Sequence, residues 1–289
     1  MQTYWMETEV HSLKGKTVVI TGATGGLGQA MCRRFLSWGA SLLMVIRNEG
    51  KAELLKRKLL KEFPGAEISW ILCDLQDMDS VKEAAGSLSH EAVDYLLLNA
   101  GTYAIPKALS TAGYDTVFQV NFLSHYYLVR TLLPKLKEQK AKVVVTGSIA
   151  HRFNPLDPAD PDFSHHQGAN NIYGNSKRFL MFATMELCRQ EGVNFAIGHP
   201  GISYTGITSN YPPEALAVVR PRMQLLFPNP EQACLGMVRA AFAEVPFDHW
   251  IGPGYFDVWG DPVISPLHSC SPQERRKIFK IAEEIYRGL

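Results

Sequence analysis

Short apolar segments alternate with helical segments along most of the chain, and this alternation constrains the fold more than any other feature. Six segments have the length and the largely apolar character of buried strands: residues 17–20, 41–46, 68–72, 95–98, 142–146 and 194–198. Helical stretches between them predict helices over residues 26–38, 51–63, 79–88, 114–140 and 172–190. The alternation predicts an α/β fold of the Rossmann type, a doubly wound parallel sheet with helices on both faces.

The length and composition fit a chain that folds as one domain. A chain of 289 residues without a linker or repeat predicts a single domain over residues 1–289. The formal net charge of +1 gives no electrostatic basis for binding nucleic acid. The N-terminal segment has no apolar signal-peptide core, and no segment is apolar over the length of a membrane-spanning helix. The five cysteines have no metal-ligand spacing, so we predict no metal site and a reduced, cytoplasmic compartment.

The C-terminal end has the signature of a helix start. In "SPQE", Ser271 is a predicted N-cap, proline occupies the first helical position, and Glu274 follows three residues after the cap. Ile278, Ile281 and Ile285 then form an apolar stripe. These features predict a helix over residues 271–288.

The most informative motif is a glycine-rich turn between the first strand and the first helix, in "KTVVITGATGGLG". Gly22 can make a tight turn, Gly26 lets the backbone approach a pyrophosphate, and Gly28 lets the helix pack closely on the strand. The helix N-terminus favours an anion through its N–H groups and its dipole. A purely structural turn is the alternative.

This turn resembles the TGxxxGxG signature of the short-chain dehydrogenase/reductase family, through Thr21, Gly22, Gly26 and Gly28. It also fits TGxxGxxG, the signature of the extended branch of that family. Two features favour the shorter oxidoreductase branch. "NAG" follows the fourth predicted strand, and only about 90 residues follow Pro200, too few for a further substrate domain.

The resemblance extends over about residues 14–205 and implies a nicotinamide cofactor and a set of site residues. It implies that Asn121, Ser148, Tyr173 and Lys177 are the catalytic residues. It also implies cofactor contacts at Thr21, Gly22, Thr24, Gly25, Gly26, Leu27, Gly28, Asp74, Leu75, Asn99, Ala100, Gly101, Tyr173, Lys177, Pro200, Gly201 and Thr205. The family forms assemblies, so a homodimer or a homotetramer is compatible with the resemblance.

Tyr173 and Lys177 have a spacing that suits acid–base chemistry. Residues four apart lie on one face of a helix, although an unrelated pair on a solvated face has the same spacing. A nearby ammonium is expected to lower the phenol pKa from about 10, so that Tyr173 can exchange a proton with a carbonyl or alcohol oxygen. By resemblance, Ser148 hydrogen-bonds the same oxygen, Lys177 also binds the nicotinamide ribose, and Asn121 supports a water that relays protons.

The end of the second predicted strand indicates which cofactor is used. NAD enzymes usually place an acidic residue there to bind the ribose 2′-hydroxyl. Here Arg47 occupies that place, with Lys51 four residues later, and a guanidinium suits a 2′-phosphate. We therefore predict NADP(H) in preference to NAD(H). The alternative is that Arg47 is simply solvated and that Glu49 supports NAD.

An insertion separates the predicted catalytic serine and tyrosine, which are 25 residues apart. Residues 151–171 resemble a long segment of the retinol-dehydrogenase-like subgroup, as "SIAHRF" does. We predict a loop at the substrate entrance, with a surface insertion as the alternative. Its aspartates, Asp157, Asp160 and Asp162, are interpreted as a solvated acidic loop rather than a cation site. His165 and His166 lack the partners of a zinc site.

The substrate is predicted to be apolar. Residues 206–227 follow the position of the family's substrate lid and combine proline and glycine with many apolar residues, although ordinary core helix has the same composition. The sequence thus predicts an NADP(H)-dependent oxidoreductase that interconverts a carbonyl and an alcohol on a retinoid, steroid, lipid or aromatic compound. The alternative is a nucleotide-sensing or scaffold protein without catalytic activity.

Overall fold

The computed structural model describes residue 10 and residues 12–152, 155–201, 228–243, 255–256, 262–263 and 271–289. Its centre is one sheet with the order β3-β2-β1-β4-β5-β6-β7-β8. The strands are β1 (Thr17–Thr21), β2 (Ser41–Ile46), β3 (Ile68–Leu72), β4 (Tyr95–Leu98), β5 (Lys142–Thr146), β6 (Asn194–Gly198), β7 (Tyr255–Phe256) and β8 (Pro262–Val263). Neighbouring strands from β3 to β7 are parallel, and β8 is antiparallel to β7. The predicted doubly wound α/β fold is confirmed.

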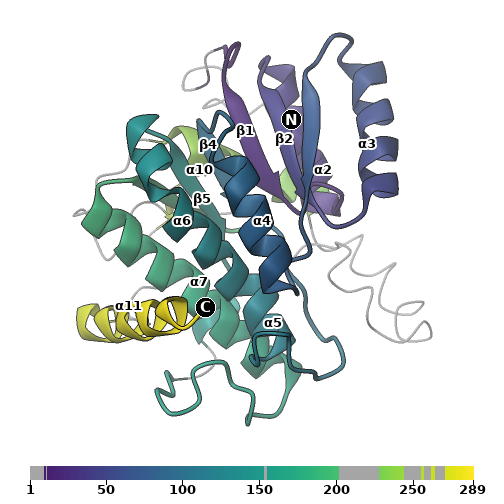
Figure 1. Cartoon of the computed structure of the whole chain (residues 1–289). Helices are drawn as coiled ribbons and strands as arrows, with labels where there is room; N and C mark the ends of the chain where they lie inside the picture. The colour runs from purple at the N-terminus through teal and green to yellow at the C-terminus, as the bar shows by residue number, and fades with distance from the viewer. Residues whose placement is uncertain are drawn as a thin grey trace.

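Helices cover both faces of this sheet. They are α2 (Gly26–Ser37), α3 (Glu49–Glu62), α4 (Met78–Leu88), α5 (Thr116–Phe118), α6 (Ser124–Glu138), α7 (Ala169–Glu191), α9 (Pro230–Ala233), α10 (Leu235–Phe242) and α11 (Pro272–Arg287). In Figure 1, α4 and α6 lie in front of the strands and α10 lies behind them. Two short segments complete the described elements: the π-helix η1 (Gln119–Leu123) and the 3-10 helix η2 (Ile149–Arg152).

The core has two layers, because alternate residues of each strand point to opposite faces. Val19 on β1, for example, packs into the layer formed with α4, α6, α7 and α11, whereas Val18 and Ile20 pack into the layer formed with α2, α3 and α10. The strands are therefore apolar on both sides, as the continuous apolar segments predicted.

The predicted elements agree with the structure except at a few boundaries. The single helix expected over residues 114–140 is divided into α5, η1 and α6. Helix α7 begins at Ala169, three residues earlier than expected, and the helices α9 and α10 and the two-residue strands β7 and β8 were not predicted. At the C-terminus the Ser271 hydroxyl accepts a hydrogen bond from Glu274 N at 3.1 Å, which confirms the predicted cap of α11.

The topology places the carboxyl ends of the parallel strands along one edge of the sheet. Strand β1 lies between β2 and β4, so the winding direction changes next to β1, where open α/β sheets bind ligands. Most of the predicted cofactor-binding residues lie in the turns that follow β1 to β6, whereas Asn121 lies in η1 and Tyr173 and Lys177 lie in α7. The fold therefore brings them to one edge.

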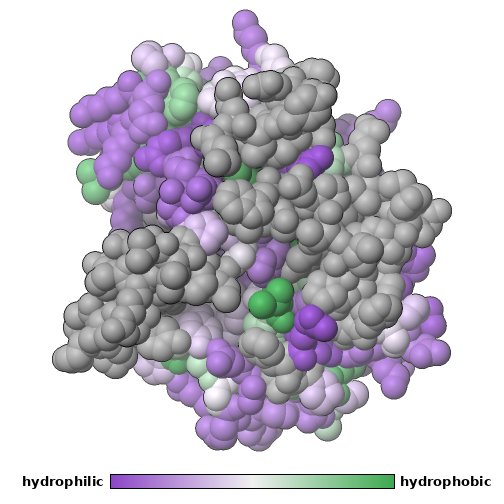
Figure 2. Space-filling view, turned by 180° about the vertical axis from the view of Figure 1, so that it is seen from behind, coloured by the Kyte–Doolittle hydropathy of each residue, from purple (hydrophilic) through white to green (hydrophobic). Residues whose placement is uncertain are grey.

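The exposed surface of the described residues is mostly hydrophilic on the face shown in Figure 2. The large hydrophobic residues with high exposure are Leu54, Leu72, Leu109 and Ile149. Among the helices of the described residues, we find none that is both long enough and apolar enough to cross a membrane.

Candidate active site

The glycine-rich turn has the geometry of an anion cradle. Gly22 adopts a left-handed φ of +69°, and a Cβ on it would lie 2.8 Å from Ala100 Cα. A Cβ on Gly28 would lie 2.2 Å from Gly22 O, so only glycine lets α2 pack this closely on the turn. The first turn of α2 has no acidic residue, whereas the first turns of α3 and α4 contain Glu49 and Asp79. The N-terminus of α2 is thus suited to a phosphate.

The turn is attached to β4 through the side chain of Thr21. Its hydroxyl accepts hydrogen bonds from the backbone N–H groups of Asn99 and Ala100, both at 2.9 Å. The Asn99 amide returns a hydrogen bond to Thr21 O at 3.1 Å. Thr21 is fully buried, so its side chain positions the turn, and a direct cofactor contact by this side chain is not what the geometry supports.

His125 continues this network into the π-helix. Its Nδ1 lies 3.2 Å from Asn121 O and its Nε2 lies 2.9 Å from the Thr21 hydroxyl. A carbonyl only accepts, so Nδ1 carries the proton; Nε2 must then accept from the Thr21 hydroxyl, whose oxygen already accepts from two amides. Burial lowers the pKa of His125 to about 4, so the ring is neutral. The His125 imidazole therefore connects the glycine-rich turn with the backbone of Asn121.

Asn121 is held in one orientation by three contacts. Its Oδ1 accepts from Thr102 N at 2.7 Å, and its Nδ2 donates to Thr102 O and to the Ser176 hydroxyl, both at 3.0 Å. Ser176 in turn donates to Tyr173 O at 2.7 Å. Asn121 lies in η1, and a π-helical turn within a helix often marks a functional position.

Ser148, Tyr173 and Lys177 meet beside this asparagine. Ser148 and Tyr173 are half-buried, and their side chains are hydrogen-bonded to each other. Lys177 is buried, and its ammonium donates a hydrogen bond to Thr146 O at 3.1 Å. A Cβ on Gly101 would lie 3.3 Å from Asn121 Oδ1 and 3.6 Å from Lys177 Nζ, so both head groups gather at that glycine. The structure brings together all four residues predicted to be catalytic.

The electrostatics differ from the prediction. Burial raises the pKa of Tyr173 to about 12, and the hydrogen bond with Ser148 opposes this only in part. The predicted lowering by Lys177 is wrong in this state of the protein. The ammonium lies 5.8 Å from the centre of the Tyr173 ring, and burial lowers the pKa of Lys177 itself to about 8. Desolvation disfavours the charged form of both groups and sets the direction of both pKa shifts.

His199, which the sequence analysis missed, connects the Ser148 turn with the turn after β6. Ile149 N donates to its Nε2 at 3.2 Å, and Gly201 N points at its Nδ1 at 2.9 Å. Both contacts disfavour an imidazolium, which has no acceptor. Burial lowers the pKa of His199 to about 4, and His151 and Lys177 add to the effect. Pro200 and Gly201 are half-buried beside it, and Thr205 lies outside the described residues.

The residues predicted to bind the adenosine end follow β2 and β3. Arg47 and Lys51 are exposed, at the end of β2 and in the first turn of α3. Asp74 is half-buried, and its Oδ1 accepts from Gln76 N at 3.0 Å. Leu75 O accepts from the Ser124 hydroxyl at 2.7 Å, which ties this strand end to α6. These residues lie at the expected edge of the sheet.

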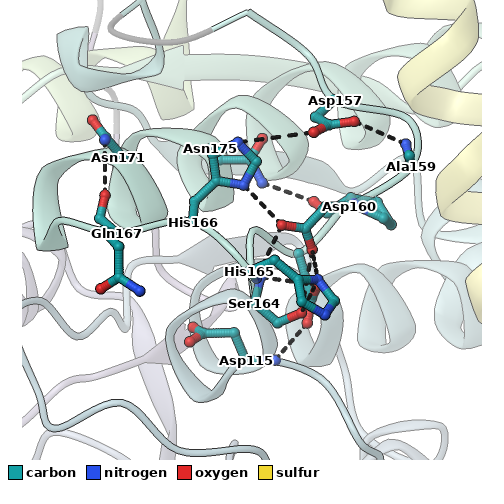
Figure 3. Close-up of polar contacts among 12 residues, drawn as sticks. Asp115, Asp157, Ala159, Asp160, Ser164, His165, His166, Gln167, Asn171 and Asn175 are labelled. Atoms are coloured by element: carbon teal, nitrogen blue, oxygen red, sulfur yellow. Dashed lines mark hydrogen bonds and ion pairs between the residues drawn. The ribbon is translucent and has the colours of Figure 1, made fainter.

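The insertion is organised around a buried carboxylate, as Figure 3 shows. Asp160 accepts from His166 Nδ1 at 2.7 Å, from His165 N at 3.0 Å and from the Ser164 hydroxyl at 3.2 Å. Burial alone would raise the pKa of Asp160, but the hydrogen bonds from His166 and His165 outweigh it and hold the pKa at about 2. The interpretation as a solvated acidic loop is wrong for Asp160 and Asp162, which are 7% and 6% exposed. No group of metal ligands occurs within the described ranges, Asp157, His165 and His166 included.

The same loop is hydrogen-bonded to α5 and α7 near Tyr173. Asp162 Oδ2 accepts from Asp115 N at the start of α5 at 2.7 Å, and Asn175 Nδ2 donates to Pro161 O at 2.7 Å. Phe163, Val117 and Ile172 form a small core against which Ile105 and Tyr173 pack. A cavity of about 130 Å³ lies between residues 104–107, 115–117 and 166–172. The insertion is thus an integral wall beside Tyr173.

Gly174 allows the closest approach between α7 and the Ser148 turn. A Cβ on it would lie 2.3 Å from Ala150 O, which is far shorter than a van der Waals contact. We expect Gly174→Ala to lower the free energy of unfolding by about 1–3 kcal/mol, because α7 must shift away from η2, and to lower any turnover as well. Urea unfolding measures the change.

Gly86 on α4 is the matched control, because no atom lies within 4 Å of its added Cβ. We expect Gly86→Ala to raise the free energy of unfolding by about 0.5–1 kcal/mol through helix propensity alone. Equal effects of the two substitutions would contradict the close-contact argument.

Comparison with known proteins agrees with this site. The chain matches the short chain dehydrogenase family model over residues 16–215, and it therefore belongs to the short-chain dehydrogenase/reductase family. It is 33% identical over 201 residues to the WW domain-containing oxidoreductase of Homo sapiens, covering 68% of this chain and 47% of that protein. It is 32% identical over 204 residues to retinol dehydrogenase 12 of Mus musculus, covering 68% and 65%. The chain thus spans about half the length of some curated relatives that it matches.

Solved structures show the same fold. A putative uncharacterized protein from Mycobacterium paratuberculosis has a TM-score of 0.76 at 25% identity, with 99% of this chain and 98% of that chain covered. A metagenomic short-chain oxidoreductase in complex with NADP has a TM-score of 0.58 at 24% identity, with 80% and 93% covered. The predicted membership of the family and the Rossmann-type fold are confirmed.

Proposed function

We propose that the protein is an NADP(H)-dependent oxidoreductase that interconverts a carbonyl and an alcohol on an apolar substrate. The convergence of Asn121, Ser148, Tyr173 and Lys177 at the carboxyl edge of the sheet is the observation that supports it most directly. The cofactor supplies the hydride. Ser148 donates a hydrogen bond to the substrate oxygen, and Tyr173 exchanges the proton with that oxygen.

The states of the side chains suit the reductive direction. A phenol with a pKa near 12 is protonated at neutral pH and can donate its proton to a carbonyl oxygen. Lys177, with a pKa near 8, still carries its charge at neutral pH, 5.8 Å from the centre of the Tyr173 ring. Alcohol oxidation needs the phenolate first, so we propose that the oxidative rate rises with pH in the alkaline range.

The cofactor is proposed to sit along the carboxyl edge. The glycine-rich turn and α2 would hold the pyrophosphate, Asp74 and Leu75 the adenine, and Asn99 to Gly101 the nicotinamide side, together with Tyr173, Lys177, Pro200, Gly201 and Thr205. Arg47 and Lys51 would bind the 2′-phosphate. This choice of NADP(H) over NAD(H) rests on exposed cations at the end of β2.

Arg47→Asp tests the cofactor choice. We expect the ratio of kcat/KM for NADPH to that for NADH to fall by about tenfold or more, because a carboxylate repels the 2′-phosphate and accepts from a 2′-hydroxyl. Arg57→Asp makes the same charge change on the exposed surface of α3 and should leave the ratio unchanged. A wild-type protein that prefers NADH would contradict the role of Arg47.

The substrate class is proposed from the walls of the site. Ile149, next to Ser148, is 41% exposed, and the apolar cluster around Phe163 packs against Tyr173. Burying apolar substrate surface against such residues is favourable, by about 25 cal/mol per Å². The proposed roles of residues 151–171 as a substrate wall and 206–227 as a lid complete the site, although the second segment lies outside the described residues.

The decisive experiment is oxidation of NADPH and NADH against a panel of retinoid, steroid, aromatic and small polar carbonyl compounds. We expect turnover with NADPH and the apolar compounds. Cofactor binding without turnover on any compound would instead support a nucleotide-sensing protein.

A further inference from the structure

Arg178 is a buried cation that directly follows Lys177 in α7. Only 4% of its side chain is exposed. Its Nε and Nη2 donate to the same carbonyl oxygen, His151 O, at 3.0 and 2.7 Å. Its Nη1 donates to the carboxylate of Glu274 in α11, which offsets the cost of burying the charge. Arg178 thus joins the C-terminal helix to the η2 turn.

His151 passes this restraint on to Ser148. His151 N donates to Ser148 O at 3.2 Å, and its Nδ1 faces the same carbonyl, so Nδ1 carries the proton. The ring packs edge-on against Phe182, with ring centroids 5.5 Å apart, and His151 is 1% exposed. Inside the same turn, Ala150 N donates to the Ser148 hydroxyl at 3.2 Å. The backbone carbonyl of Ser148 is therefore held by His151.

Glu274 is itself held in place by the start of its helix. Ser271 caps Glu274 N, and the carboxylate at this third helical position extends to Arg178. The rest of α11 is packed through Ile278, Ala282 and Ile285. In Figure 1, α11 lies beside α7 at the C-terminal end of the chain.

We propose that Arg178, paired with Glu274, is a positioning residue for Ser148, so that docking of the C-terminal helix α11 is required for the serine to be aligned for catalysis. The inference rests on the proposed function, because it assigns Ser148 the role of orienting the substrate oxygen. The path runs from Glu274 through Arg178 and His151 to Ser148. The ion pair in this path joins Arg178 and Glu274, which are 96 residues apart in the sequence.

Arg178→Met is the direct test in the full chain. We expect kcat with NADPH and an apolar carbonyl compound to fall by about 10- to 100-fold, because the serine is displaced, while KM for NADPH stays within about twofold. Arg178→Lys retains the positive charge and should recover part of the loss. Because the Ser148 hydrogen bond lowers the pKa of Tyr173, the alkaline limb of the reduction profile should move to higher pH in Arg178→Met.

Glu274→Gln is a milder substitution that perturbs folding less than Arg178→Met does. It should lower kcat by about three- to tenfold in the wild-type background and cause no further loss when added to Arg178→Met, since it acts through Arg178. Glu283→Gln is the matched control. Glu283 also docks α11, through Tyr126 and Arg130 on α6, but has no contact with His151. Its kcat should stay within about twofold of wild type.

Hydrogen exchange provides a readout that does not depend on turnover. Backbone amides in residues 147–152 should exchange at least about tenfold faster in Arg178→Met and measurably faster in Glu274→Gln, but at the wild-type rate in Glu283→Gln. If the wild type has no turnover, the proposed function fails and this comparison still tests the restraint. Unchanged exchange in Arg178→Met, or equal effects of Glu274→Gln and Glu283→Gln, would overturn the inference.

Discussion

Tyr173→Phe is expected to lower the rate of carbonyl reduction by about 10²- to 10⁴-fold, because it removes the proton donor and leaves the aromatic ring in place. The phenylalanine ring keeps the packing against Ile172, Val117 and Phe163. It also keeps the edge-on contact with Tyr103, whose ring centroid is 5.3 Å away. Binding of NADPH, measured by titration, should therefore change little.

Tyr103→Phe is the control for this substitution. It also removes one hydroxyl close to the site, but that hydroxyl donates to Asn170 Oδ1 at 2.6 Å and not to a proposed catalytic residue. We expect it to retain turnover within a few-fold of wild type. Substantial turnover in Tyr173→Phe, or an equal loss in both variants, would show that Tyr173 is not the proton donor.

The second large effect is a loss of stability in weak acid. Burial lowers the pKa of His125 and of His151 from 6.5 to about 4. Between these values the unfolded chain takes up protons that the folded chain cannot, so the free energy of unfolding falls as the pH falls from about 6.5 to about 4. The loss at pH 5 is about 2 kcal/mol for each histidine. His199 changes in the same direction.

Together, His125 and His151 would remove about 4 kcal/mol by pH 5, a large part of the 5–15 kcal/mol that stabilises a typical domain. Urea unfolding at several pH values between 7 and 4.5 measures the slope. His125→Gln should reduce that slope, whereas replacement of the exposed His90 by glutamine should not. A slope in His125→Gln that equals the wild-type slope would mean that His125 is not buried in its neutral form.

Local patterns in the sequence were sufficient to predict strands β1 to β6 and the glycine-rich turn. Strand segments are apolar because both faces of the sheet are covered, and that requirement is visible in a few consecutive residues. The long helix over residues 114–140 was predicted as continuous, since the π-helical turn that presents Asn121 has no signal in apolar periodicity.

The sequence by itself determined the class of fold, the family, and which residues meet at the carboxyl edge, because parallel strands end at one edge wherever the chain alternates strand and helix. Only the tertiary structure decided the chemical states at that edge. Burial raises the Tyr173 pKa. The neutral His125 ring forms a hydrogen bond with the Thr21 hydroxyl, 104 residues away in the sequence. Within the insertion, the buried Asp160 carboxylate accepts a hydrogen bond from His166. Desolvation and hydrogen bonding depend on what surrounds a group in space, and residues distant in sequence supply most of those surroundings.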